Sequence, residues 1–559
     1  MKATRPTATL SHESNRKFKK LPSSGWGHHF LSAQIDVSEM DALAQEIETL
    51  KPKVKDMLMF SKSTDSAKKR ILLIYMLVSL GVAYHFEDEI EESLKEGFEK
   101  IHEMIAGDDD LYTISIIFWV FRTYGYNMSS DVFKRFKGEN GKFKESLIGN
   151  VNGMVSLYEA AHLRTTTDDI LDEALTFTTS NLESLAIAGE ILPHVSMRIQ
   201  NALCMPQRYN AEMVYTKEYI SFYEQEEDHN EMLLRFTKIN FKFMQLTWIQ
   251  ELKTLTKWWK KQDLASKLPP YFRDRLVECY LFALMIYFEP RFSLGRVSLV
   301  KINTVLTIVD DTCDRYGSVS EVAALVDCVE RWDPHCVDSL PDYMKTVFKF
   351  ALNVFEECEC AGKSEEGLSY NVQGALEEFK ICLRANFCFT KWAHGEVVPT
   401  FDEYLEIGGV EVTTYVSIAS SFLGLGEMAR EQAYEWLKSR PKFVQDQAKR
   451  ARLMNDMTGF EDDMGRGYVT NAINYYMKQY KVTEEEAFVE LQKMDMDLEK
   501  TVNEELLKRS KRVPREILKR AVDFVRMVDF TYRNGEEYTH PEGRFKELIT
   551  SLFVDLIRL

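Results

Sequence analysis

The chain contains unusually few residues that break helices. Its 559 residues include 26 glycines and 14 prolines, about 7% together, whereas about 12% is usual in globular proteins. Apolar residues recur at helical spacing from about Met40 to the C-terminus, while the alternation typical of strands is hard to find. A chain of this length exceeds what one hydrophobic core normally serves. The sequence therefore predicts an all-α protein of two domains.

The most marked change in composition along the chain lies near residues 225–240. The polar stretch EQEEDHNE is followed there by the aromatic-rich LLRFTKINFKFMQLTWIQ. A polar segment that precedes a long apolar helix is a reasonable domain boundary. We therefore expect an N-terminal helical domain over residues 1–235 and a C-terminal domain over residues 236–559.

Charge and cysteine usage limit the partners and the compartment. The formal net charge is −17 and no long basic tract occurs, which argues against a nucleic-acid or anionic-membrane partner. The nine cysteines are an odd number, as expected for reduced thiols. The longest apolar run, Ile71–Tyr84, is too short to span a bilayer. We expect a soluble intracellular protein, plastidic if the Ser/Thr-rich residues 1–15 are the remainder of a transit peptide and cytosolic otherwise.

Three aspartates follow an apolar run in the segment LTIVDDTCDRYG at residues 306–317. On a helix, Asp310, Asp311 and Asp314 are spaced so that all three carboxylates can converge on one side. Like charges at this separation raise one another's pKa unless a cation neutralises them. The alternative is a solvated helix end, but the apolar residues just upstream indicate a helix that leaves a core and presents the acids at its mouth. A hard divalent cation such as Mg²⁺ suits such oxygen ligands.

A second acidic segment, RLMNDMTGFEDDMGRG, occupies residues 452–467. Asn455, Gly459 and Asp463 are four residues apart on a helix and therefore lie along one stripe. Asn455 and Asp463 can bracket a metal ion, with a gap at Gly459. A charged helix end is again the alternative, and the presence of two such motifs favours the metal site. Between them, Gly408-Gly409 predicts a break or kink in another helix.

A further match to the first spacing occurs at residues 167–172, TDDILD. It has no second motif in the N-terminal half, and the residues around it have an ordinary amphipathic pattern. We interpret Asp168 or Thr167 as the cap of the helix that follows, not as a metal ligand.

The two motifs together resemble those of class I terpene synthases. DDTCD at 310–314 resembles the family's DDxxD motif, and NDMTGFEDD at 455–463 resembles its second metal motif. Arg16-Lys17, followed eight residues later by Trp26, looks like the N-terminal R(R/P)x8W element of plant members. Further plant-like blocks cover almost the whole chain: WGHHFL (26–31), YHFEDEI (84–90), ENGKFKESL (139–147), LPPYFRDRLVECY (268–280) and YTHPEG (538–543). The closest likeness is to the subfamily of sesquiterpene and sesterterpene synthases.

The resemblance implies an N-terminal relict α-barrel and a C-terminal catalytic helical bundle. Because the acid-initiating motif DxDD is absent from the sequence, the reaction is expected to start only by loss of diphosphate. By family match, Asp310, Asp311 and Asp314 would bind two Mg²⁺ ions, which Mn²⁺ can replace. Asn455, Gly459 and Asp463 would form the site of a third ion.

The resemblance also implies residues that hold the substrate. Arg273 and Arg452 would clamp the diphosphate of a prenyl diphosphate, with Arg275 nearby. A dry, aromatic pocket would then fold the chain and stabilise the carbocation. The aromatic candidates are Phe282, Trp392, Tyr532 and Tyr538. We expect a monomer.

Some positions depart from the family pattern. Gly459 replaces a Ser or Thr that would ligate the third metal ion. Cys313 and Phe282 are smaller than the usual residues at their positions, and residues 417, 419, 420 and 421 are Ser or Ala. A roomier pocket follows from these changes, so the C25 substrate geranylfarnesyl diphosphate is favoured over C15 farnesyl diphosphate.

Two other functions are compatible with parts of the pattern. A chain-elongating prenyltransferase also uses aspartate-rich motifs and Mg²⁺, but it carries two DDxxD motifs on a shorter, single domain. A decayed cyclase that persists as a helical scaffold is suggested by Gly459, although the intact Asp310, Asp311, Asp314, Arg273 and Arg452 argue against decay.

Overall fold

The computed structural model describes residues 18, 20, 21 and 24–559, except 60–63, 109, 190, 363–367, 430 and 510–512. The described residues form helices and contain no β-strand; an isolated β-bridge joins Lys137 and Phe143. The predicted all-α class is therefore confirmed. Residues 1–15 and the Arg16-Lys17 pair lie outside the described residues.

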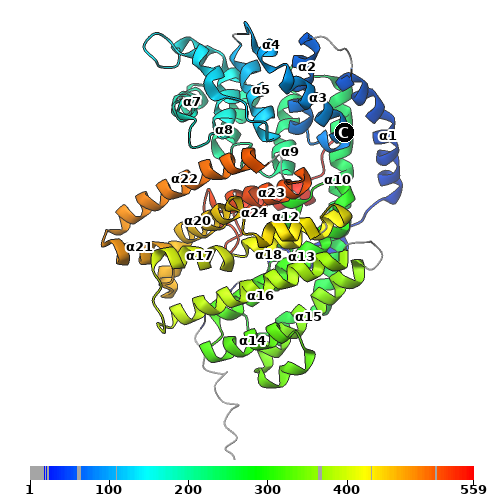
Figure 1. Ribbon diagram of the computed structural model, residues 1–559. Coiled ribbons are helices and arrows are strands. Elements are labelled where there is room, and N and C mark those ends of the chain that lie inside the picture. The colour runs from blue at the N-terminus through cyan, green and yellow to red at the C-terminus, as the bar shows by residue number, and fades with distance from the viewer. Residues whose placement is uncertain are drawn as a thin grey trace, which may run out of the picture.

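The helices form two groups that are also consecutive in the chain, with the blue-to-cyan group above the green-to-red group in Figure 1. The first group contains α1 (Val37–Met59), α2 (Thr64–Ser79), α3 (Glu87–Glu99), α4 (Ile101–Ile105), α5 (Leu111–Thr123), α6 (Val151–Ala161), α7 (Asp169–Ala188), α8 (Pro193–Cys204) and α9 (Glu212–Tyr223). The second contains α10 (Glu231–Gln262), α11 (Leu264–Lys267), α12 (Leu276–Ile286), α13 (Ser293–Arg315), α14 (Val319–Arg331), α15 (Asp342–Gly362), α16 (Leu368–Ala393), α17 (Phe401–Glu411), α18 (Thr414–Ser421), α19 (Glu431–Lys438), α20 (Lys442–Arg466), α21 (Ala472–Tyr480), α22 (Glu484–Arg509), α23 (Arg515–Tyr532) and α24 (Arg544–Phe553).

The long helix α10 connects the two groups. Asn230 caps it by accepting a hydrogen bond from the Leu233 backbone amide at 2.9 Å. Its apolar face is buried over most of its length and contacts α1 and α9 of the first group as well as α12 and α24 of the second. The predicted boundary at residues 235/236 falls within this helix and stays a prediction.

Helix α13 runs through the centre of the second group. Its neighbours are α12, α15, α16 and α18, and its residues Leu299–Val309 are mostly buried. By length and composition the segment Pro290–Arg315 could cross a membrane, but 72% of its most apolar window is buried inside the protein. This is the environment of a core helix, and it agrees with the predicted absence of a membrane span.

The N-terminal group is joined to the metal-motif helix α20 by buried ion pairs. Arg450 of α20 pairs with Asp529 of α23 at 3.0 Å and with Asp495 of α22 at 2.9 Å. One turn along α22, Glu499 pairs with Arg164 of the N-terminal group at 3.1 Å. Burial alone would raise the pKa of Glu499, but the guanidinium groups around it, that of Arg164 foremost, lower this pKa to about 2. The position of α20 therefore depends on both groups of helices.

Asp168 has a structural role, as the sequence indicated, but not as a helix cap. It stands at the N-cap position of α7, yet its carboxylate accepts no hydrogen bond from that helix. It pairs instead with Arg122 of α5 at 3.0 Å and accepts hydrogen bonds from the Ser130 hydroxyl at 2.6 Å and the Thr165 amide at 2.9 Å. The carboxylate thus joins three segments of the N-terminal group.

Replacement of Asp168 by Ala is therefore expected to lower the free energy of unfolding by about 3–5 kcal/mol, because Arg122 would stay buried without its partner. Asp169→Ala, at an exposed neighbouring position, is the control and should change it by at most about 0.5 kcal/mol. Urea-induced unfolding of both variants, followed by circular dichroism, measures the difference. Equal midpoints for the two variants would contradict the structural role of Asp168.

Candidate active site

The first acidic motif lies where α13 leaves the core. Each of Asp310, Asp311 and Asp314 offers one carboxylate oxygen within 4.8 Å of the other two. The side chains of Asp310 and Asp314 are 26% and 15% exposed, and both line a cavity of about 610 Å³. The predicted convergence of the three acids is therefore present.

Asp311 differs from its two neighbours because it does not line the cavity. Its side chain is fully buried. One oxygen accepts hydrogen bonds from the Arg273 backbone amide at 2.6 Å and from Arg273 Nε at 3.2 Å, and the other lies 3.0 Å from Arg315 Nε. The expectation that all three acids face the cavity is thus wrong for Asp311, whose charge is neutralised by two arginines. Arg273 also contacts Asp310, with Nη2 at 2.7 Å from Oδ2.

The second motif faces the same cavity from α20. Asn455, Gly459 and Asp463 all line it, as their spacing of four residues predicted. A Cβ atom placed on Gly459 would have no heavy atom within 4 Å, so the gap between Asn455 and Asp463 is open space. The two motifs therefore face each other across one cavity.

Most of the residues that the sequence singled out meet in this cavity. It lies between α13, the α17–α18 junction, α20 and α23, and it also includes the loop that follows α23. The predicted residues that line it are Arg273, Phe282, Asp310, Asp314, Arg452, Asn455, Gly459, Asp463, Tyr532 and Tyr538. Tyr538 is fixed by hydrogen-bond contacts of its hydroxyl with Thr307 Oγ1 at 2.6 Å and Cys279 Sγ at 3.3 Å.

Arg275 and Trp392 do not reach the cavity. Arg275 is 2% exposed and donates from Nε and Nη2 to the carbonyls of Tyr538 and Thr539, each at 3.0 Å. It therefore holds the loop that carries Tyr538. Trp392 packs against Phe389, at 5.0 Å between ring centroids, within a separate apolar cluster.

The helix break also differs from its predicted place. Gly408 and Gly409 are regular residues of α17, and the break follows at Val412-Thr413, where Thr413 is left-handed at φ 68°. A Cβ on Gly408 would lie 2.6 Å from Arg452 Cδ, and one on Gly409 would lie 2.9 Å from Ala448 Cβ. The glycines thus permit close contact between α17 and α20, while the break at Val412-Thr413 lines the cavity.

The sequence did not single out several charged residues of the cavity, among them Glu411, Arg466 and Arg315. Glu411 accepts a hydrogen bond from Arg452 Nη1 at 2.7 Å, Arg466 contacts Asp314 and Asp463, and Arg315 contacts Asp311. Glu411 could have been recognised as a candidate site residue, because it is the one acidic residue in the apolar segment GGVEVTT. The two arginines follow their motifs directly, but nothing in the sequence shows where their side chains point.

Burial makes this cluster of acids costly to charge. Burial, together with the neighbouring Asp314, raises the pKa of Asp310 to about 7 despite the nearby Arg273. Burial also raises the pKa of Asp463 to about 6 and that of Glu411 to about 8, although Arg466 and Arg452 respectively oppose these shifts. A divalent cation that binds here would therefore displace protons.

The donor atoms fit a hard divalent cation. All candidate ligands are carboxylate or amide oxygens, which Mg²⁺ and Mn²⁺ prefer. Asp314 Oδ1 is buried and receives no hydrogen bond from any described residue, so an acceptor is available for a metal ion. Asn455 Oδ1 accepts from Arg452 and would have to exchange this partner.

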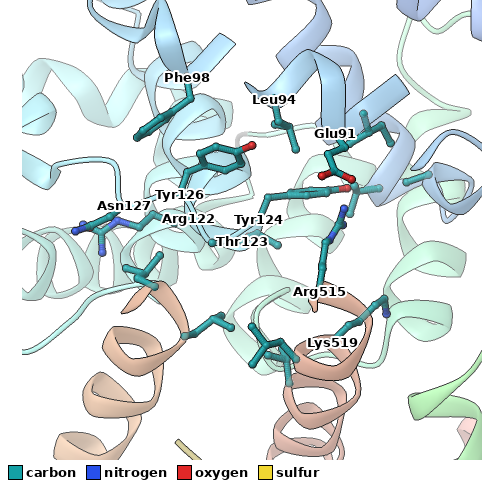
Figure 2. A pocket seen from close by; sticks show the side chains of 18 of the residues that line it. Glu91, Leu94, Phe98, Arg122, Thr123, Tyr124, Tyr126, Asn127, Arg515 and Lys519 are labelled. Atoms are coloured by element: carbon teal, nitrogen blue, oxygen red, sulfur yellow. The ribbon is translucent and has the colours of Figure 1, made fainter. Parts of the chain in front are cut away.

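A larger cavity, about 1030 Å³, lies elsewhere, between the two groups of helices (Figure 2). Arg515 of α23 reaches toward Tyr124 and Glu91 there (Figure 2), and its guanidinium lies 4.2 Å from the centroid of the Tyr124 ring. Lys519 is already paired with Asp523 at 3.0 Å. Within the described part of the chain, only Asp310, Asp311 and Asp314 form a group of three acidic, His or Cys side chains close enough to share a metal ion. The smaller, acidic cavity is therefore the candidate active site.

Comparison with known proteins agrees with this geometry. Residues 25–203 match the family model "Terpene synthase, N-terminal domain", and residues 260–501 match "Terpene synthase family, metal binding domain". Terpenoid synthase 1 of Arabidopsis thaliana is 78% identical over 560 residues, which cover 100% of this chain and 92% of that protein. Alpha-barbatene synthase of the same plant is 54% identical and covers 98% of this chain and 99% of that protein.

Solved structures show the same fold. Isoprene synthase from grey poplar, determined with three Mg²⁺ ions and dimethylallyl-S-thiolodiphosphate, has a TM-score of 0.83 and 25% identity, covering 96% of this chain and 99% of that one. Limonene synthase has a TM-score of 0.87 with 24% identity over the same shares of the two chains. The predicted two-domain architecture is thus confirmed, and the chain belongs to the plant class I terpene synthase family.

Proposed function

We propose that this enzyme is a Mg²⁺-dependent cyclase that ionises an acyclic prenyl diphosphate and cyclises the resulting carbocation to a hydrocarbon. The observation that carries the proposal is the pair of acidic motifs that face each other across one cavity. Three Mg²⁺ ions are proposed, held by Asp310 and Asp314 on α13 and by Asn455 and Asp463 on α20, while the buried Asp311 holds Arg273 and Arg315 behind them. The proposal excludes the scaffold and prenyltransferase alternatives, which the experiment below distinguishes from it.

The role of the cations is to neutralise the diphosphate as the allylic C–O bond breaks. Arg273 and Arg452 line the same cavity and supply further positive charge. Both are already paired: Arg273 with Asp310 and Asp311, and Arg452 with Glu411 and Asp456. Each would exchange a carboxylate for a diphosphate oxygen when substrate binds.

The inner part of the cavity suits a carbocation. Phe282, Tyr532 and Tyr538 line it, and the rings of Phe282 and Tyr538 lie 5.0 Å apart. Aromatic faces stabilise positive charge without providing a nucleophile. The adjacent walls from α23 are Phe524, Met527 and Val528, which exclude water from the reactive intermediate.

The structure weakens the argument for the longer, C25 substrate, because fewer of the small residues reach the cavity than the sequence suggested. Of the positions that suggested a roomier pocket, Phe282 and Ser417 line the cavity. Cys313 and residues 419–421 are at most 2% exposed and are absent from the cavity wall. Since alpha-barbatene synthase and two (Z)-gamma-bisabolene synthases, named for C15 products, are 50–54% identical to this chain, we propose farnesyl diphosphate as the main substrate. The C25 diphosphate is the second candidate, favoured by Phe282 and Ser417.

The purified enzyme should therefore convert C15 diphosphate to hydrocarbons when C10, C15, C20 and C25 diphosphates are supplied one at a time with Mg²⁺. Pyrophosphate release and mass spectrometry of the products are the measurements. If none of the four substrates releases pyrophosphate, the decayed scaffold is favoured. Formation of a longer diphosphate on addition of isopentenyl diphosphate would identify a prenyltransferase.

Asp310→Asn is expected to reduce kcat by at least about 100-fold, equivalent to about 2.7 kcal/mol, with little change in melting temperature, because Asp310 lies at the cavity. Asp311→Asn should reduce both kcat and melting temperature, since it leaves Arg273 and Arg315 without a buried partner. Asp169→Asn is the control, because Asp169 is an exposed residue of the TDDILD segment, which has the same spacing but is not expected to bind metal. Activity of Asp310→Asn close to that of the control would remove Asp310 from the metal site.

Gly459→Ser is expected to lower the Mg²⁺ concentration needed for half-maximal rate. The added hydroxyl enters open space between Asn455 and Asp463 and supplies the missing ligand. Gly465→Ser is a matched control, because it lies on the same helix, also has open space for a Cβ and does not line the cavity. The same Mg²⁺ dependence in both variants would argue against a metal ion at this position.

A further inference from the structure

Arg466 connects the two acidic motifs across the cavity. Its Nη1 donates to Asp314 Oδ2 of α13 at 3.1 Å. Its Nη2 and Nε donate to Asp463 Oδ1, on its own helix, at 2.9 Å and 3.2 Å. The three side chains are 15–17% exposed, and the guanidinium lies 4.3 Å from the centroid of the Tyr468 ring. The side chain is thus held on three sides.

The guanidinium occupies oxygen atoms that a metal ion would need. Asp314 and Asp463 belong to different motifs, and one oxygen of each is bound to Arg466. A divalent cation placed against either oxygen would meet a positive charge at close range. Asp314 Oδ1 accepts no hydrogen bond from any described residue, but a cation bound there would still lie close to the guanidinium and be repelled by it. Arg466 therefore opposes metal binding without any other ligand, and separating this guanidinium, which is only 17% exposed, from both carboxylates is costly.

A diphosphate group changes the competition between Arg466 and a metal ion for the carboxylates, because its oxygens offer Arg466 new partners. We propose that Arg466 is a positioning residue that competes with the divalent cations and so makes their binding depend on the diphosphate. This inference rests on the proposed function of the cavity. By thermodynamic linkage, a group that releases Arg466 from the carboxylates raises metal affinity, and the metal ions raise affinity for that group equally. The enzyme without substrate is then poor in metal.

A purely structural role for Arg466 is the alternative. An arginine in the last turn of a helix interacts favourably with the helix dipole, and Arg466 ends α20. Loss of that role would lower the melting temperature to the same extent with and without metal ions and would leave metal affinity unchanged. The two explanations therefore differ in a binding measurement that involves no turnover.

The test is equilibrium dialysis of Mn²⁺ against the wild-type protein and Arg466→Gln, each with and without inorganic pyrophosphate. Mn²⁺ and its pyrophosphate complex pass the membrane, so excess metal on the protein side is bound metal. Arg331→Gln is the control, because it makes the same change in net charge at an exposed surface pair with Asp327. We expect Arg466→Gln to bind Mn²⁺ several-fold more tightly without pyrophosphate, and pyrophosphate to enhance this binding less than in wild type.

Equal or weaker Mn²⁺ binding by Arg466→Gln in the absence of pyrophosphate would overturn the inference. Arg466→Lys serves if the Gln variant does not fold, since a lysine keeps the charge but cannot span both carboxylates as the guanidinium does; it should bind Mn²⁺ more tightly than wild type. Failure of the proposed function would look different: wild-type protein would release no pyrophosphate from any prenyl diphosphate, whatever the behaviour of Arg466→Gln.

Discussion

Carboxylates from α13 and α20 share one partly buried cavity, and their mutual repulsion has to be neutralised in every state of the enzyme. In the structure described here, Arg273, Arg315 and Arg466 do this by direct ion pairs with Asp310, Asp311, Asp314 and Asp463. In the working enzyme, metal ions and the diphosphate would take over part of this role. Under the proposed function, Arg273 and Arg466 would exchange partners during the catalytic cycle.

This exchange of partners requires that α13 and α20 keep a fixed separation. Gly408 and Gly409 let α17 approach α20 closely enough to hold the Arg452 stem, and the buried pairs of Arg450 with Asp495 and Asp529 fix the opposite side of α20. Through Glu499 and Arg164 the same set of ion pairs reaches the N-terminal helices. The N-terminal group thus supports the geometry of the candidate active site, although none of its described helices lines the cavity.

The sequence predicted the features that follow from local spacing. The convergence of Asp310 and Asp314, and the stripe formed by Asn455, Gly459 and Asp463, depend only on helical periodicity. The helix break was predicted at the wrong position because a Gly-Gly pair can indicate either a kink or close packing of two helices. Only the position of Arg452 against Gly408 shows that close packing is the reason for this pair. The burial of Asp311 and the pairing of Arg466 with Asp314 depend on residues far apart in the chain, so periodicity gives no information about them. Arg275 was placed near the diphosphate by resemblance, whereas its guanidinium binds backbone carbonyls and does not line the cavity.

The proposed function requires the two facing motifs to hold divalent cations against a diphosphate. The most direct measurement is anomalous diffraction from crystals of the enzyme grown with Mn²⁺ and an unreactive prenyl thiolodiphosphate. Manganese peaks are expected in the cavity beside Asp310 and Asp314 and beside Asn455 and Asp463, with Arg466 withdrawn from at least one carboxylate. Manganese peaks confined to other parts of the molecule, with the analogue bound outside this cavity, would contradict the proposed function.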